Sequence, residues 1–133
     1  VALRPYFTDL CDSIAASMIL DEDRVSLKVD ADESMAGADA SVSLGLIVTE
    51  LVINALKHAF PNHRQGSILV EYRSRAPGWQ LTVRDTGIGL PPDRARAKPG
   101  LGTGIVSALA RQLGATVTVA DAAPGMSVTI ARD

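Results

Sequence analysis

The amino-acid sequence predicts an α+β fold, a two-layer α/β sandwich in which a mixed sheet of about five strands is covered on one face by three helices. One observation is the order of the hydrophobic patterns, which read helix, strand, helix, strand, strand, helix, strand, strand. This order lacks the regular alternation of a doubly wound domain. A second is the alternation of apolar and polar residues in the strand segments, which is typical of one buried face. A third is size, because 133 residues, 47% of them hydrophobic, suffice for one domain with one core.

The first two elements are expected to build core rather than chemistry. Pro5 suits the first position of a helix, and apolar residues recur after it at helical spacing as far as Met18. Cys11 lies on the apolar side of this helix and is the only cysteine in the chain. A buried, reduced thiol in the cytoplasm fits it best. The segment from Arg24 to Asp30 then alternates like a half-buried strand.

The longest helix is predicted from Ser43 to Phe60. It is apolar on nearly all sides, so we expect it to be buried nearly all round. Glu50, Asn54 and Lys57 break the pattern, with His58 beside Lys57, because their spacing stacks them along one edge. Burying a carboxylate, an amide and an ammonium together costs several kcal/mol unless they are paired or face a wet cavity. We therefore expect this stripe to line a pocket. The alternative is a hydrogen bond from Asn54 to Glu50, with Lys57 reaching water.

A hairpin follows the long helix. Its strands are predicted from Ser67 to Ser74 and from Trp79 to Asp85, around a turn at Pro77 and Gly78. The glycines after the second strand, Gly87 and Gly89, permit a tight loop that a ligand can approach closely. The carboxylate at the strand end is suited to accept a hydrogen bond from an amino group, for instance on a purine.

The last third of the chain combines a basic loop, a helix and two strands. Pro91 to Pro99 holds three prolines and three cations with little to bury, so we interpret it as a mobile lid. The next helix starts in a glycine-rich segment, and the backbone N–H groups from Gly102 to Ile105 form an anion site. Gly114 ends this helix. The final strands, Thr116 to Ala120 and Met126 to Ala131, flank one more turn.

Together these features indicate a nucleotide triphosphate site. The polar stripe, the strand-terminal Asp85 and the glycine-rich helix start each supply one part of it. Asn54 is a neutral oxygen ligand suited to Mg²⁺, which keeps several waters and takes few protein ligands.

Other nucleotide and metal sites fit the sequence less well. Gly100, Gly102 and Gly104 precede a helix and the next strand ends near Asp121, but the spacing lacks the third glycine of a dinucleotide-binding fingerprint. No lysine follows these glycines, which excludes a P-loop. The two histidines of the chain lie five residues apart without a third ligand. The acidic loop after Asp30 lacks the spacing of a calcium loop and is expected to be a solvated turn.

Three segments resemble the N, G1 and G2 boxes of the GHKL ATPase superfamily, which includes histidine kinases, gyrase B, Hsp90 and MutL. They are Glu50-Leu-Val-Ile-Asn54-Ala-Leu-Lys57-His58-Ala-Phe, Asp85-Thr-Gly87-Ile-Gly89-Leu and Gly100-Leu-Gly102-Thr-Gly104. The first box and the short lid are most similar to the HisKA_2 and HWE subgroup of sensor histidine kinases. The resemblance covers nearly the whole chain and implies a Bergerat fold.

The resemblance also implies a role for each matching residue. Asp85 would bind the adenine amino group, and Asn54 would coordinate a Mg²⁺ that bridges the phosphates of ATP. Glu50 would orient or polarise a water or a metal-bound group, while Lys57 and His58 would meet the phosphates. The nucleotide-binding set would be completed by Gly87, Gly89, Gly100, Gly102, Thr103 and Gly104.

Two departures from the family pattern stand out. In the family a threonine usually follows the glycine of the last hairpin and assists at the adenine, whereas Met126 follows Gly125 here. Thr129 lies an odd number of residues from Met126, so its side chain points to the opposite face of the strand. We therefore expect weaker adenine binding than usual. The phosphoacceptor histidine of such kinases normally lies in a separate helical hairpin, and no segment of this chain resembles one.

The sequence therefore predicts the catalytic, ATP-binding domain of a two-component sensor histidine kinase, inactive for autophosphorylation in isolation. Its expected partners are a phosphoacceptor dimerisation domain and a response regulator. Two alternatives remain: a docking module that keeps the fold without catalysis, and a serine kinase that acts as an anti-sigma factor.

Charge and hydropathy limit the kinds of partner and the cellular location expected for this domain. The net charge of −2 and the absence of a long basic run argue against nucleic acid or membrane surfaces as the main partner. No uninterrupted apolar stretch reaches the roughly 18 residues of a membrane span. The first residue is Val1 rather than methionine, so we expect a segment of a longer cytoplasmic region, with any sensor domain outside it.

Overall fold

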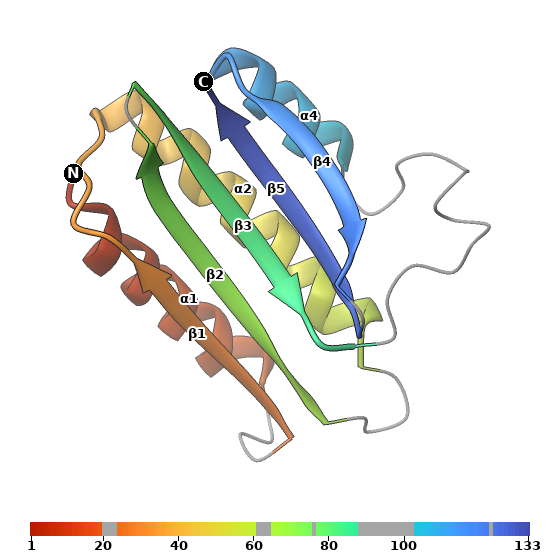
Figure 1. Ribbon diagram of the computed structural model, residues 1–133. Coiled ribbons are helices and arrows are strands. Elements are labelled where there is room, and N and C mark those ends of the chain that lie inside the picture. Colours follow the sequence, from red (N-terminus) through yellow and green to blue (C-terminus); the bar gives the residue numbers. More distant parts are fainter. Residues whose placement is uncertain (20–23, 61–64, 76, 88–102, 123) are drawn as a thin grey trace.

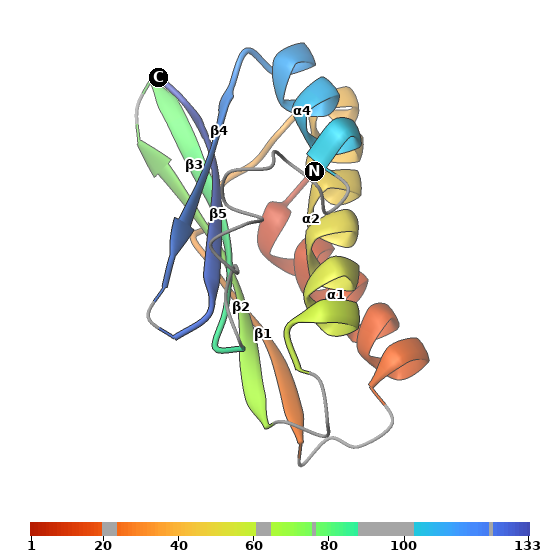
Figure 2. The ribbon, with the colours of Figure 1, turned by 90° about the vertical axis from the view of Figure 1, so that its right-hand side faces the viewer.

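The computed structural model describes residues 1–19, 24–60, 65–75, 77–87, 103–122 and 124–133, apart from the side chains of residues 75 and 103. It has two layers, a sheet and a layer of helices on one face of it (Figure 1; Figure 2). The elements are α1 (Leu3–Met18), β1 (Val25–Ala31), α2 (Ala38–His58), β2 (Gly66–Arg75), β3 (Gly78–Asp85), α4 (Thr103–Gln112), β4 (Thr116–Asp121) and β5 (Met126–Arg132). The predicted order and the predicted sandwich are confirmed.

The sheet is five-stranded and mixed, with the order β1-β2-β3-β5-β4. Only β1 and β2 run parallel, and the other neighbours are antiparallel. In β3, Leu81, Val83 and Asp85 are buried on the helix side. The register pairs Val83 with Val128, which places the side chain of Met126, two residues earlier in β5, on the face that carries Asp85.

Two helices begin earlier than predicted. α1 starts at Leu3, so Pro5 is the third helical residue and not the first. Its missing N–H still costs little, because the first N–H groups of a helix have no partner within the helix. α2 starts at Ala38 after an extended Gly37, five residues before the predicted Ser43. The small residues of this turn give no apolar periodicity, although the acidic Asp39 favours a helix start.

α2 is the centre of the core, but it is not buried nearly all round as predicted. Leu44, Val48 and Val52 are almost fully buried, whereas Val42 and Leu46 are 57% and 51% exposed. The helix is long and apolar enough to cross a membrane by length and composition alone. That is weak evidence, because a core helix packed on a sheet passes the same test.

The two ends of the sheet differ in character. At the end where β3 begins, the Trp79 ring stacks on Tyr72 at 6.0 Å between centroids, and Tyr72 also contacts Phe7. At the end where β3 finishes, Asp85 lies beside the last turn of α2 and the start of β5. The buried Cys11 belongs to the core as predicted, and burial raises the pKa of its thiol to about 11.

Candidate nucleotide-binding site

Asp85 is the most unusual polar residue in the described part of the chain. Its side chain is 4% exposed, and its Oδ1 accepts hydrogen bonds from the N–H groups of Gly87 at 2.9 Å and Met126 at 3.2 Å. Burial raises the pKa of this carboxyl, and the two N–H donors offset the effect only in part. The site therefore contains a fixed, poorly hydrated acceptor, which is what recognition of a donor on a ligand requires.

Two glycines let the backbone close around this carboxyl. Gly125 has φ +95°, and a Cβ there would lie 1.9 Å from the Asp85 backbone oxygen. A Cβ on Gly87 would lie 2.2 Å from the backbone oxygen of Ala59, just after α2. Any larger residue would push β5 or α2 away from Asp85. Gly87 is thus closely approached by Ala59, one residue beyond α2. The predicted approach of a ligand to this glycine stays a prediction.

Thr86, which has no predicted role, anchors the segment after β3. Its N–H donates to the Ser67 carbonyl at 3.0 Å, and its Oγ1 accepts from the Ser67 N–H at 2.9 Å. These bonds tie the chain after Asp85 to the start of β2. A hydroxyl residue directly after a strand-terminal aspartate was the available signal.

The polar stripe of α2 runs toward the same end of the molecule. Glu50 and Asn54 are half-buried, and Lys57 and His58 are exposed in the last helical turn. The positive charge of Lys57 there also complements the negative end of the helix dipole. The contact between Gly87 and Ala59, one residue beyond α2, brings the Asp85 segment to the end of this stripe.

The helix predicted to bind phosphate begins at Thr103, as expected. A Cβ added to Gly104 would meet no described atom within 4 Å, so packing within the described part does not require glycine there. Gly89, Gly100 and Gly102 and the predicted lid lie outside the described residues. Their assignment to the nucleotide stays a prediction.

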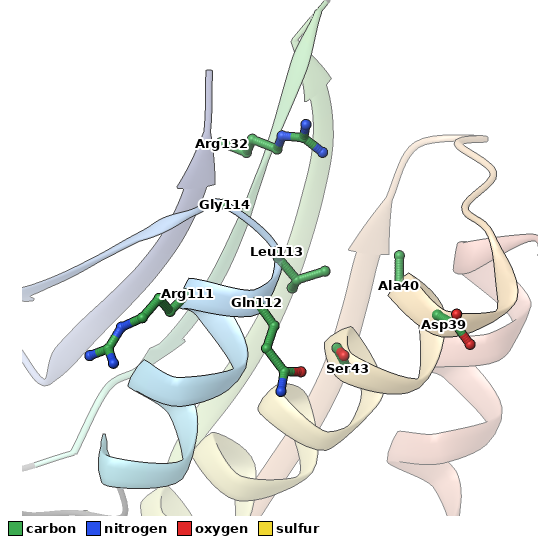
Figure 3. Close-up of a pocket in the computed structure, with 8 residues that line it drawn as sticks. All are labelled: Asp39, Ala40, Ser43, Arg111, Gln112, Leu113, Gly114 and Arg132. Carbon is green, nitrogen blue, oxygen red and sulfur yellow. The ribbon is translucent and has the colours of Figure 1, made fainter.

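A hollow of about 490 Å³ lies at the other end of the helix layer and is separate from this site (Figure 3). It is lined by Asp39, Ala40 and Ser43 of α2, by residues 111–114 at the end of α4, and by Arg132 of β5. None of the predicted site residues contributes to it. Within the described residues no cluster of three His, Cys, Asp or Glu side chains is placed to hold a metal ion.

Comparison with known proteins identifies the class. Residues 39–132 match the family described as "Histidine kinase-, DNA gyrase B-, and HSP90-like ATPase". The protein belongs to this family, and ATP binding follows from that membership. The resemblance predicted from the three boxes is thereby confirmed for the family, while the HisKA_2 and HWE subgroup stays a prediction.

Individual relatives point to the histidine kinases. Blue-light-activated histidine kinase 2 of Erythrobacter litoralis is 36% identical over 110 residues, which cover 80% of this chain and 31% of that protein. Sensor histidine kinase PdtaS of Mycobacterium tuberculosis is 36% identical over 61 residues, 45% of this chain and 12% of its own. The chain thus spans less than a third of each relative.

Solved structures agree with this result. The blue-light activated histidine kinase of Erythrobacter litoralis EL346 superposes with a TM-score of 0.87 at 28% identity, over 98% of this chain and 41% of its own. The catalytic domain of histidine kinase ThkA has a TM-score of 0.74 at 14% identity, over 98% of this chain and 92% of its own, which shows the shared fold alone.

Proposed function

We propose that this chain is the catalytic domain of a two-component sensor histidine kinase, which transfers the γ-phosphate of ATP to a histidine on a separate dimerisation domain. The observation that carries the proposal is Asp85, a buried carboxyl fixed by two backbone N–H groups at the end of β3. It lies in a fold shared over 98% of the chain with a histidine kinase. Its Oδ2 would accept a hydrogen bond from the amino group of adenine.

Asn54 is the residue we assign to Mg²⁺. Its half-buried amide lies on the stripe of α2, and a single neutral oxygen suits an ion that keeps most of its waters. When bound, the ion would neutralise phosphate charge. Glu50, one turn earlier, would orient a water, and the exposed Lys57 and His58 would contact the phosphates. Phosphoryl transfer asks little more of a protein than such positioning and charge neutralisation.

The metal assignment has its own test. Asn54→Ala should weaken ATP binding measured by calorimetry in Mg²⁺ far more than binding measured in EDTA, because the amide acts through the ion. Val42→Ala, at the far end of α2, serves as a control that changes the same helix away from the site. Equal losses with and without Mg²⁺ would make Asn54 a structural residue.

The acceptor should come from another domain. His58 is held in the last turn of α2 among the residues assigned to phosphate, so it cannot move to a position in line with the leaving oxygen. We therefore propose a dimerisation domain as acceptor, a response regulator downstream of it, and no direct role for nucleic acid or membrane. A cytoplasmic setting completes the proposal, since the reaction consumes ATP.

Incubation with γ-labelled ATP, with and without the dimerisation domain of the parent protein, tests the transfer. We expect acid-labile, base-stable label on the partner only. Acid-stable label would favour the serine kinase, and no label despite ATP binding would favour the docking module. Label on the isolated 133 residues would contradict the requirement for a separate acceptor.

A further inference from the structure

β4 forms one edge of the sheet, and in the described part of the chain no strand pairs with its outer side (Figure 1). In the turn that joins it to β5, the Ala122 N–H donates to the Gly125 carbonyl at 3.0 Å. Ladder hydrogen bonds alternate along an antiparallel pair, so the β4 residues bonded to β5 lie an even number of positions from Ala122. The N–H and C=O groups of Val117 and Val119 therefore point away from β5. We call these groups the open edge of β4.

The opposite edge of the sheet, β1, is protected in ways that β4 is not. Lys28 and Asp30 are exposed charges within β1, and Arg4 Nε donates to the Ala31 carbonyl at 2.7 Å. Charged side chains on an edge strand hinder pairing with another chain. β4 consists of threonine, valine and alanine up to Asp121, and it pairs with β5 without a bulge. Residues with high β propensity thus present an edge that can accept a further strand.

The side chains of β4 suit a second copy of the same strand. Val119 is 43% exposed on the helix side of the sheet. Thr118 is exposed on the other side and pairs with Thr129, whose hydroxyl oxygen lies 3.3 Å from that of Thr82. A two-fold axis through Thr118 would place this threonine opposite its own copy, and Val119 opposite Val117 of the second copy. Valines would then cover valines on one face, and the row of threonines would continue across the axis on the other.

The same register uses the open edge of both copies. Val117 of each copy would exchange N–H···O=C bonds with Val119 of the other, while the two Thr118 residues would form a pair without hydrogen bonds, with Cα atoms about 4.5 Å apart. An axis through Val119 would instead bring the carboxylate of Asp121 against Val117. That register is less favourable, because it places a charge against an apolar side chain.

We propose that the open edge of β4 pairs with β4 of a second copy of this chain, so that one sheet runs through both copies. The axis is perpendicular to the sheet, so the helix layers of both copies would lie on the same face. A single strand pair buries far less than the roughly 1,200 to 2,000 Å² of a stable complex. We therefore expect a dissociation constant of about 0.1 to 1 mM, which becomes effective where a longer protein holds two copies close together.

Opposite charges at Thr118 test the position of the axis. In Thr118→Lys or Thr118→Glu alone, like charges face each other across the axis, so self-association measured by sedimentation should weaken by about tenfold or more. An equimolar mixture of the two variants should associate at least as tightly as wild type. The same substitutions at Thr116, which would face Ala120 of the second copy, are the matched control and should leave association within about threefold of wild type.

Val119→Pro and Val119→Ala distinguish pairing at the edge from stacking of sheet faces. Both remove the valine side chain, and only proline removes the outward N–H, which the β4–β5 ladder does not use. The alanine variant should keep association within about fivefold of wild type, and the proline variant should lose it. If proline prevents folding, oxidation of Thr118→Cys decides the question. It should give an intermolecular disulfide, because the Cα separation at the axis suits one, whereas Thr116→Cys should not.

Wild type that remains monomeric up to about 1 mM would overturn the proposal. Association that is unchanged by charge at Thr118, or by the loss of the Val119 N–H in a folded variant, would overturn it as well. None of these results would affect ATP binding or the proposed function. A failure of wild type to bind ATP would contradict the proposed function and leave the pairing of β4 standing.

Discussion

Two aspartates at opposite ends of the sheet accept backbone N–H groups, yet the pKa values of their carboxyls move in opposite directions. Asp32 follows β1, and its oxygens accept from the Ser34 N–H, the Ser34 hydroxyl and the Ser74 N–H. Burial alone would raise the pKa of Asp32, but these hydrogen bonds and the charge of Arg73 together lower it. For Asp85, burial outweighs two hydrogen bonds and the pKa rises.

The difference lies in how many acceptor positions the protein itself fills. Both oxygens of Asp32 are used to hold the connection before α2 against the end of β2, so this carboxylate has a structural task. Asp85 uses one oxygen for the same kind of closure, and its other oxygen accepts no hydrogen bond from the described residues, as the proposed role at adenine requires. A buried carboxyl with one oxygen left without a hydrogen bond is a candidate binding residue. A carboxyl whose two oxygens both accept hydrogen bonds from the protein has a structural role.

The largest expected effect separates the two in binding. Asp85→Asn should weaken ATP binding by about 1 to 3 kcal/mol, because an amide offers no charged acceptor to the adenine amino group. Asp32→Asn should leave the affinity unchanged. Calorimetry of both variants makes the comparison, and equal losses would show that the two ends are not functionally distinct.

For the free energy of unfolding we expect the opposite order, with the larger loss at Asp32. Asp32→Ala should lower the free energy of unfolding by about 1 to 2 kcal/mol, since it removes charge-assisted hydrogen bonds and leaves the Ser74 N–H without its acceptor. Asp85→Asn should leave stability unchanged or raise it, because the amide oxygen can keep the two N–H bonds without a desolvated charge. Urea unfolding measures both. A larger loss at Asp85 would mean that its carboxylate serves the fold first.

The pH dependence should differ in sign. The pKa of Asp32 is lowered, so its stabilisation is present above the unfolded-state pKa near 3.8 and is lost as pH falls through the folded value. The pKa of Asp85 is raised, so the folded state is stabilised as pH falls through its folded value toward 3.8. Thermal melts from neutral pH to pH 3 measure both effects. As pH falls from neutral toward about 4, the stability of wild type should rise relative to that of Asp85→Asn. Below about pH 4, the stability advantage of wild type over Asp32→Asn should shrink.

The smallest effect concerns the face of the sheet that the helices do not cover (Figure 2). Thr129 pairs with Thr82 across β3 and β5, with 3.3 Å between the hydroxyl oxygens, on the face opposite Asp85. Thr129→Val should therefore leave ATP affinity unchanged and cost about 0.5 to 1 kcal/mol of stability. Thr82→Val should behave alike. Weaker ATP binding in Thr129→Val alone would give this threonine a role at the base after all.

Much of the fold could be predicted because its signals are local. Alternation in β2 and β3 identified the buried faces, and the odd separation of Thr129 from Met126 placed the threonine hydroxyl away from the site. The start of α2 was missed because residues 38–42 carry no apolar period. Leu46 was expected to be buried because it is apolar. It is 51% exposed, because no described element packs against its side of α2.

The candidate site divides in the same way. Sequence by itself determined which groups are available: a carboxyl at a strand end, a polar stripe on one helix edge and glycines where the backbone must pass closely. Only the tertiary structure decided that Asp85 is buried and that its Oδ1 meets Met126, 41 residues further along the chain. The physical reason is range. Helix and strand periodicity act over a few residues, while the desolvation of Asp85 and its hydrogen bond from the Met126 N–H exist only once β3, β5 and the end of α2 have packed together.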